Sequence, residues 1–189
     1  MKLYAYTYQY DRIKKEGYKS LALINRNDPT FADRIAVHAD NTGSDNPKDI
    51  WAYLEGTFPG RTKSVCAITS PAPVQVYNHN YLNYLIHHAD LVSFDVDRLW
   101  QDGLIEAIYC KDMRETILKD YFFENIYPIK TPDEIDREPL DWSLCEKRPY
   151  FHRSPWAAIK HYFLVLKDGR IPPEYITLET DNSKKREKT

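Results

Sequence analysis

A short basic turn near the middle of the chain could bind an anion. Residues 59–64, with the sequence PGRTKS, place two cations and two hydroxyls in a predicted turn just before a strand. The guanidinium of Arg61 offers a bidentate fork for phosphate, and backbone N–H groups in such a turn can add donors. The spacing is not that of a P-loop. The segment therefore predicts either a phosphate or nucleotide contact at Arg61 or an ordinary solvated turn.

Cysteine and histidine suggest a second kind of chemistry. Cys66 lies on a predicted strand and could form a thiolate–imidazole pair with His152 or His161, which would make the protein a Cys-dependent hydrolase. A cysteine in the middle of a strand is more often buried and inert. The same two readings apply to Cys110, although Lys111 beside it could lower the pKa of the thiol.

Two further groups suggest metal sites but have simpler explanations. His79, Asn83 and His87 recur at helical spacing, but two histidines eight residues apart are two turns apart, farther than zinc ligands on one helix usually are. Asp95 and Asp97 alternate onto one face at a strand end, where paired carboxylates can bind a cation. The simpler reading places both in water, with Asp97 capping the helix that follows. No metal is predicted.

An aromatic loop near the C-terminal end could be a recognition surface. Tyr, Trp and Arg dominate binding hot spots, and such residues gather in the predicted loop at Tyr150, Phe151, His152, Arg153 and Trp156. This loop is the candidate contact for a protein partner. It supports an alternative function, that of a non-catalytic interaction protein such as a secreted bacterial effector or a toxin-system partner.

Composition limits the remaining classes. The chain has 189 residues, of which 42% are hydrophobic, and this length favours one domain. We expect a single domain over residues 1–180 and a disordered, basic tail over 181–189. A net charge of −2 makes a nucleic acid an unexpected partner, and no apolar run is long enough to insert in a membrane. Cys66, Cys110 and Cys145 are odd in number and far apart, which fits a reducing, cytoplasmic compartment and leaves delivery into a host cell open.

The apolar patterning predicts strands and helices in mixed order. Period-two alternation and apolar runs predict strands at residues 2–8, 64–69, 91–96, 104–110 and 161–166, with a final strand within 171–179. Helical spacing predicts helices at 10–15, 31–37, 49–54, 77–89 and 113–123. We expect strands 91–96 and 104–110 to form a hairpin and residues 127–148 to be irregular. The expected fold is α+β: mixed, mainly antiparallel sheets with short flanking helices around a cleft. The polar stretch 25–49 is long enough for a lid or binding loop.

Four segments, in this order, resemble the ADP-ribosyltransferase-like fold. Residues 4–7 followed by 12–20 resemble its opening strand, helix and Gly-hydrophobic-x-Ser step. Residues 65–71, 91–96 and 162–176 resemble a strand with a hydroxyl residue, a later core strand and the closing hairpin. Together they cover about a third of the chain.

The resemblance implies that NAD is a co-substrate bound in a cleft between two sheets. Tyr6 or Thr7 matches the first-strand position, Thr69 and Ser70 match the hydroxyl position, and Glu174, which follows the position of the family's glutamate, is a substitute candidate for it. The first strand lacks the family's usual His or Arg.

The expected function is therefore that of a nucleotide-handling protein, namely a divergent ADP-ribosyltransferase. In that reading, Arg61 takes the phosphate, the hydroxyls position the ribose, and Glu174 stabilises charge. A degenerate nucleotide-binding relative stays open, because the positions where the family's glutamate falls hold Lys160 and His161.

Overall fold

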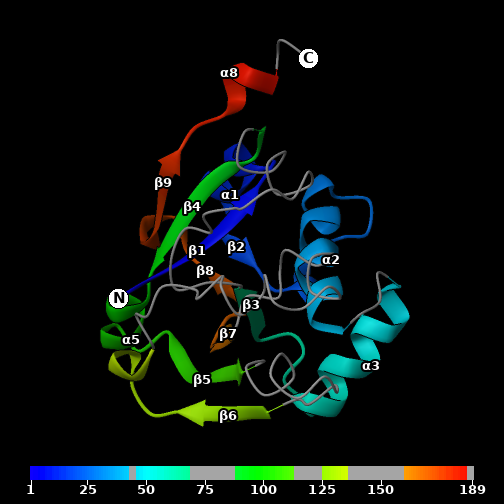
Figure 1. The fold of residues 1–189 in the computed structure, drawn as a ribbon, viewed down its shortest axis with the longest axis vertical. Coiled ribbons are helices and arrows are strands. Elements are labelled where there is room, and N and C mark those ends of the chain that lie inside the picture. Colours follow the sequence, from blue (N-terminus) through cyan, green and yellow to red (C-terminus); the bar gives the residue numbers. More distant parts are fainter. Residues whose placement is uncertain (43–45, 69–87, 113–124, 136–159, 187–189) are drawn as a thin grey trace, which may run out of the picture.

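Helices and strands alternate irregularly along the chain, and their order defines an α+β fold (Figure 1). The computed structural model describes residues 1–42, 46–68, 88–112, 125–135 and 160–186. Within these ranges the strands are β1 (Lys2–Thr7), β2 (Tyr18–Lys19), β3 (Val65–Ile68), β4 (Asp90–Asp95), β5 (Ile105–Asp112), β6 (Asn125–Ile129), β7 (Lys160–Leu166), β8 (Arg170–Ile171) and β9 (Ile176–Thr180). The α-helices are α1 (Tyr10–Glu16), α2 (Pro29–Thr42), α3 (Pro47–Thr57), α5 (Val96–Gln101) and α8 (Ser183–Arg186). Three 3₁₀ turns complete them: η1 (Leu21–Leu23), η2 (Pro132–Glu134) and η4 (Pro173–Tyr175).

The strands form antiparallel sheets. One sheet has the order β1-β4-β9, in which Lys2 of β1 pairs with Asp95 of β4 and Thr7 pairs with Asp90. A second sheet has the order β3-β7-β5-β6, and β2 pairs with β8 in a short two-stranded ladder. The mixed, mainly antiparallel class expected from the sequence is thus confirmed.

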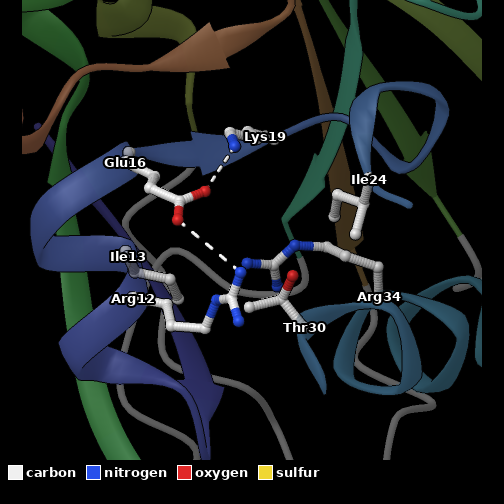
Figure 2. Close-up of a pocket in the computed structure, with 8 residues that line it drawn as sticks. Arg12, Ile13, Glu16, Lys19, Ile24, Thr30 and Arg34 are labelled. Carbon is white, nitrogen blue, oxygen red and sulfur yellow. Dashed lines mark hydrogen bonds and ion pairs between the residues drawn. The ribbon is translucent and has the colours of Figure 1, made fainter. Parts of the chain in front are cut away.

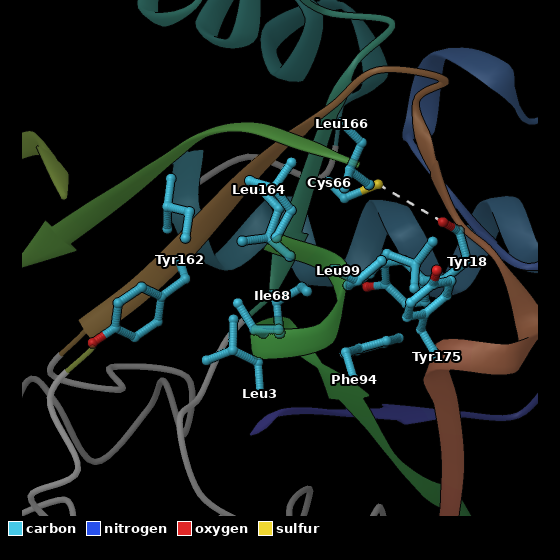
Figure 3. Close-up of a cluster of buried hydrophobic side chains, with 14 of the residues drawn as sticks. Leu3, Tyr18, Cys66, Ile68, Phe94, Leu99, Tyr162, Leu164, Leu166 and Tyr175 are labelled. Carbon is cyan, nitrogen blue, oxygen red and sulfur yellow. Dashed lines mark hydrogen bonds between the residues drawn. The ribbon is translucent and has the colours of Figure 1, made fainter. Parts of the chain in front are cut away.

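The two larger sheets share one hydrophobic cluster. Side chains alternate across a strand, and one face of β3 and β7 contributes Cys66, Ile68, Leu164 and others to this cluster. From the other sheet come residues such as Leu3 and Phe94, as Figure 3 shows. All of these side chains are almost fully buried. The cluster therefore joins the sheets into one core.

The opposite face of the second sheet packs against helices. Val65, Ala67, Phe163 and Val165 point to this side, together with buried residues of α3 and η1. Phe58 adds aromatic contacts at centroid distances of 5.2 Å to Tyr109 and 5.1 Å to Phe163. Figure 1 shows α2 and α3 along this side of the molecule.

Many expected elements agree with the structure. The strands expected at 2–8, 64–69 and 161–166 correspond to β1, β3 and β7, and the helix expected at 10–15 is α1. Gly17 ends α1, as predicted, and Asn46 caps α3 by accepting a hydrogen bond from the backbone N–H of Lys48. The glycine and the capping asparagine act within a few residues of the helix ends, so they can be recognised from the sequence alone.

The predicted hairpin of 91–96 with 104–110 is wrong. Helix α5 follows β4 immediately, and β4 pairs with β1 and β9 whereas β5 pairs with β6 and β7. The two strands therefore belong to different sheets. The cap was also misassigned: the Asp95 side chain, not that of Asp97, accepts from the backbone N–H of Arg98, and Asp97 instead forms an ion pair with the N-terminal ammonium.

Three other segments differ from their expected form. The helix expected at 31–37 is the longer α2, the final strand is split into β8 and β9, and part of the segment expected to be irregular forms β6. Pro128 is tolerated there because β6 is an edge strand. The helix expected at 113–123 and most of 77–89 lie outside the described residues.

Two further expectations concern the C-terminal tail and membrane insertion. In the expected tail, residues 181–186 include α8, and Asn182 is buried, with its backbone N–H donating to Asp90 at 2.9 Å. No helix in the described ranges is both long and apolar enough to span a bilayer.

Gly17 allows α1 to turn directly into β2. Its φ of 80° and ψ of 173° lie in a region almost exclusive to glycine. A Cβ at this position would lie 2.4 Å from the carbonyl oxygen of Ile171, on the strand that pairs with β2. The chain therefore needs a residue without a side chain at this position.

We expect Gly17→Ala to lower the free energy of unfolding by more than about 2 kcal/mol, because the substitution adds backbone strain and a steric clash. Urea unfolding followed by circular dichroism measures the change. The matched control is Gly56→Ala in α3, where an added Cβ meets nothing within 4 Å. This control should be neutral or slightly stabilising. Equal effects of the two substitutions would contradict the argument.

Candidate functional site

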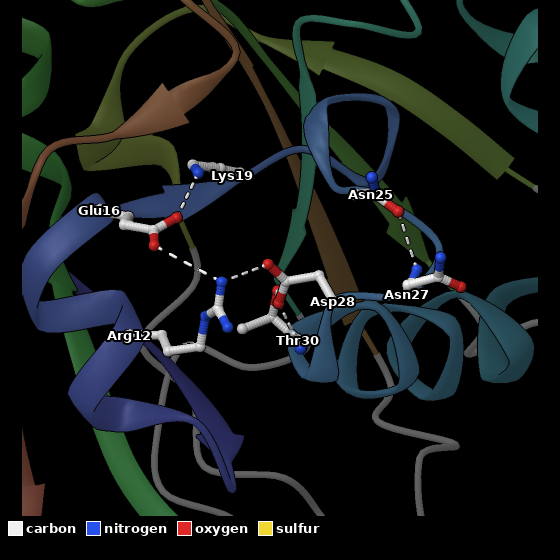
Figure 4. Close-up of polar contacts among 7 residues, drawn as sticks. All are labelled: Arg12, Glu16, Lys19, Asn25, Asn27, Asp28 and Thr30. Carbon is white, nitrogen blue, oxygen red and sulfur yellow. Dashed lines mark hydrogen bonds and ion pairs between the residues drawn. The ribbon is translucent and has the colours of Figure 1, made fainter.

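Charged side chains gather where α1, β2 and the start of α2 meet (Figure 4). The Arg12 guanidinium lies 2.6 Å from the carboxylate of Asp28 and 3.6 Å from that of Glu16. Lys19 donates to the other oxygen of Glu16 at 2.5 Å. This arrangement joins three chain segments by alternating charges.

Asp28 also caps α2. One oxygen of its carboxylate accepts from the backbone N–H of Thr30 at 2.9 Å and from the Thr30 hydroxyl at 2.7 Å, while the other accepts from Arg12. The bonds from Thr30, with Arg12 nearby, lower the pKa of this carboxyl from its usual range. Pro29, in the first turn of the helix, has no N–H that needs a partner there. Asp28 is thus fixed in position.

Arg34, on α2, is a buried cation. It is only 2% exposed, and its guanidinium carbon lies 3.3 Å from the centre of the Tyr18 ring. Two of its nitrogens, Nε and Nη1, are buried and have no hydrogen-bond acceptor among the described residues. A buried cationic donor without an acceptor is energetically costly.

Tyr18 fixes the place of this guanidinium. The Tyr18 side chain is fully buried, its hydroxyl donates to the carbonyl of Ala67 at 3.1 Å, and its ring meets Phe94 edge-on at 4.7 Å. Burial raises the pKa of the Tyr18 hydroxyl to about 12, so the ring stays neutral. The face of the ring is therefore free of charge and suited to a cation.

These residues enclose a small pocket, here called the α1–α2 pocket and shown in Figure 2. It is lined by Arg12, Ile13, Glu16, Gly17, Lys19, Ile24, Thr30 and Arg34. Its volume is about 10 Å³, enough for one water-sized atom. The guanidinium groups of Arg12 and Arg34 point toward one another across it. Two like charges in this position favour an anionic atom between them.

A larger cavity of about 280 Å³ lies on the other side of α1, near the end of β1. Its lining includes Asp11, Asp90 and Asp181 but only Lys14 as a cation, and Asp90 already accepts from the backbone of Asn182. This excess of carboxylates disfavours a phosphate. No set of three or more His, Cys, Asp or Glu side chains in the part of the chain that the structure describes is arranged to hold a metal ion.

Of the predicted site residues that the structure describes, Thr7 and Glu174 lie far apart. Thr7 is buried at one end of β1, where its hydroxyl donates to Asp33 at 2.7 Å and accepts from the backbone of Gln9, so it fixes the β1–α1 turn. Glu174 is exposed in η4, and the register places it near the opposite end of this sheet, about 17 Å away for a strand of this length. Arg61 is exposed in the α3–β3 turn.

The other predicted residues are split between β1 and segments outside the described ranges. Tyr6 is half-buried on β1, and burial raises the pKa of its hydroxyl. Thr69, Ser70, His79, Asn83, His87 and the aromatic residues Tyr150, Phe151, His152, Arg153 and Trp156 lie outside the described residues.

Cys66 does not form a nucleophilic pair with His161. Its thiol is 1% exposed, and burial raises its pKa to about 12. By alternation along β7, His161 shares a face with Phe163, whereas Cys66 packs with Leu164 on the other face. Cys110 is likewise buried in the shared core. The inert reading of both cysteines is the one that their burial supports.

Arg34 was not among the residues predicted from the sequence. Residues 25–49 are polar and predict a surface segment, and an arginine within such a stretch is ordinarily solvated. The i, i+4 spacing of Arg12 and Glu16 was a usable local signal for an ion pair on α1. The contact with Tyr18 is tertiary and has no local signal. No protein-family model, curated protein or solved structure gives a match to this chain.

The role of Asp28 predicts a pH-dependent stability. Its lowered pKa means that the carboxylate stabilises the fold above about pH 4 and that this contribution is lost as the pH falls through the folded-state pKa. We expect Asp28→Asn, which keeps the cap but loses the charge, to be less stable than the wild type at pH 7 by about 1 kcal/mol. The difference between the two proteins should shrink as the pH falls below about 4.

Urea unfolding at both pH values measures this difference. The control is Glu106→Gln, at an exposed position of β5, which should leave stability unchanged at either pH. A deficit for Asp28→Asn that is as large at pH 3 as at pH 7 would show that the charge of Asp28 is not what matters.

Proposed function

We propose that this chain binds a small phosphate-bearing ligand in the α1–α2 pocket. The single observation that carries the proposal is the buried guanidinium of Arg34, whose Nε and Nη1 lack an acceptor among the described residues. Burying an unpaired charge costs several kcal/mol, and stacking on Tyr18 offsets about 2 kcal/mol of that. An anionic oxygen would supply the missing acceptor and the missing negative charge together.

Phosphate suits this pocket better than other anions. Arginine binds phosphate through paired donors on a planar fork. Arg12 and Lys19 line the same pocket, and their side chains are 43% and 29% exposed, so they can be reached from solvent. Because the cavity holds about one atom, one terminal oxygen of the ligand would enter it while the rest of the ligand stays outside.

The resemblance to the ADP-ribosyltransferase-like fold favours a nucleotide such as NAD as the ligand. The segment 12–20, which carries part of that resemblance, supplies Arg12, Glu16, Gly17 and Lys19 to the pocket. NAD carries a pyrophosphate and therefore belongs among the compounds to test. Transfer of ADP-ribose would also need a carboxylate at the glycosidic bond, and Glu174 lies at the far end of the sheet from Thr7. We therefore propose binding rather than transfer.

The two alternatives have less support. The interaction surface around Tyr150 and Trp156 lies outside the described residues and stays a prediction. A hydrolase that uses Cys66 is disfavoured by the burial of its thiol.

We expect thermal-shift and calorimetric titrations to detect binding of phosphate, pyrophosphate, AMP or NAD. A ligand at a hundred times its dissociation constant adds about 2.7 kcal/mol of stability, a clear shift in Tm for a chain of this size. Arg34→Gln should weaken binding at least tenfold, because it removes the charge at the closed end of the pocket. Lys19→Gln should weaken it several-fold.

Lys48→Gln is the matched control, since Lys48 is an exposed lysine on α3 away from the pocket. Because Arg34→Gln alters the core, Lys19→Gln at the surface tests the site even if the former protein does not fold. Absence of binding to all four compounds, or equal affinities for the wild type and Lys19→Gln, would refute the proposal.

A further inference from the structure

The carboxylates at the α1–α2 pocket differ in how firmly they are held. Asp28 accepts bonds from Thr30 and Arg12, and its side chain is 15% exposed. Glu16 is 43% exposed, and its carboxylate contacts the side chains of Lys19 and Arg12. Glu16 can therefore rotate into solvent at little cost, because an exposed ion pair is weak. Asp28 cannot do so without uncapping α2.

Glu16 lies where a ligand would have to bind. Figure 2 shows its carboxylate between the Lys19 ammonium and the Arg12 guanidinium, with Arg34 beyond. In the absence of ligand, this carboxylate supplies negative charge to two of the three cations that line the pocket. Nothing comparable reaches Nε and Nη1 of Arg34 among the described residues.

The charges define the ligand that could replace Glu16. Arg12, Lys19 and Arg34 carry three positive charges, and Asp28 contributes one negative charge. With Glu16 rotated away, the site has a net charge of +2. A phosphate monoester near neutral pH carries about −2 and has three terminal oxygens, one for each cation. A phosphodiester carries −1 and has only two terminal oxygens.

We propose that the α1–α2 pocket recognises a terminal phosphate monoester and that Glu16 is a displaceable anion that competes with this ligand. The inference rests on the proposed function and adds its ligand class. It implies that a nucleoside monophosphate binds more tightly than NAD, whose phosphates are internal.

The test compares methyl phosphate with dimethyl phosphate by isothermal titration calorimetry on the full chain. We expect the monoester to bind at least tenfold more tightly at pH 7.5. The affinity for the monoester should fall severalfold toward pH 5, because its dianion takes up a proton and becomes a monoanion. The affinity for the diester should stay constant. The groups that face Glu16 are Arg12 on α1, Lys19 on β2 and Asp28 before α2, with Arg34 on α2 lining the same pocket. The pKa values of both carboxyls are lowered from their usual range, so neither Glu16 nor Asp28 changes its charge between pH 5 and 7.5.

Substitution of Glu16 tests the competition separately. Glu16→Gln should bind methyl phosphate about five- to tenfold more tightly than the wild type, and the control Glu106→Gln should not. AMP and O-phosphoserine present the same monoester on a nucleoside and on an amino acid. The compound with the higher affinity shows which of the two groups the site prefers.

The outcomes distinguish the two proposals. Equal affinity for both esters would overturn the assignment of a monoester, and an unchanged affinity in Glu16→Gln would overturn the competition, while binding itself would still support the proposed function. Failure of every phosphate compound to bind, to the wild type and to Glu16→Gln alike, would overturn both proposals.

Discussion

The side chain of Tyr18 is the contact on which the arrangement of the pocket depends. Its hydroxyl donates to Ala67 on β3, the edge of its ring meets Phe94 on β4, and its face lies against the guanidinium of Arg34 on α2. One buried residue thereby links a strand from each of the larger sheets to the helix that supplies the buried cation. Gly17 places Tyr18 there, because only a residue without a side chain lets α1 turn so closely past Ile171. The same contacts of Tyr18 therefore fix both the packing of the core and the position of Arg34.

The buried guanidinium of Arg34 can make two kinds of favourable contact, one with the ring of Tyr18 and one with an anion. Stacking on an aromatic face offsets part of the free-energy cost of desolvating the guanidinium. An anion that reaches Nε and Nη1 would offset more of this cost. The exposed pairs around the pocket, Arg12 with Glu16 and Lys19 with Glu16, contribute little to stability by themselves. They keep the cations oriented and partly neutralised when the pocket is empty. Arg12 and Lys19 can therefore pair with Glu16 when no ligand is bound and would contact the proposed ligand when it binds.

What the sequence predicts well here is whatever is encoded within a few residues. Alternation identified β1, apolar runs identified β3 and β7, and Gly17 marked the end of α1. Partner choice between strands was not predictable, since the apolar runs of β4 and β5 look like two arms of one hairpin although they belong to different sheets. The site was missed for a related reason: Arg34 is buried against the ring of Tyr18, which is a tertiary contact, and no local pattern distinguishes it from a solvated arginine. Thr7 matched the first-strand position of the resemblance, but its hydroxyl is used in a turn.

The register of the first sheet has a consequence for how the chain is made. Leu3 of β1 pairs with Phe94, and Phe94 in turn pairs with Ile176, so the central strand of this sheet is completed by partners from both ends of the sequence. Such non-local pairings slow folding, because long loops must close before the contacts form. During synthesis β1 and β4 can meet early, while the second edge of β4 waits for β9. An unpaired strand edge invites pairing with other chains, so the edge of β4 that pairs with β9 is open to such pairing until β9 has been made.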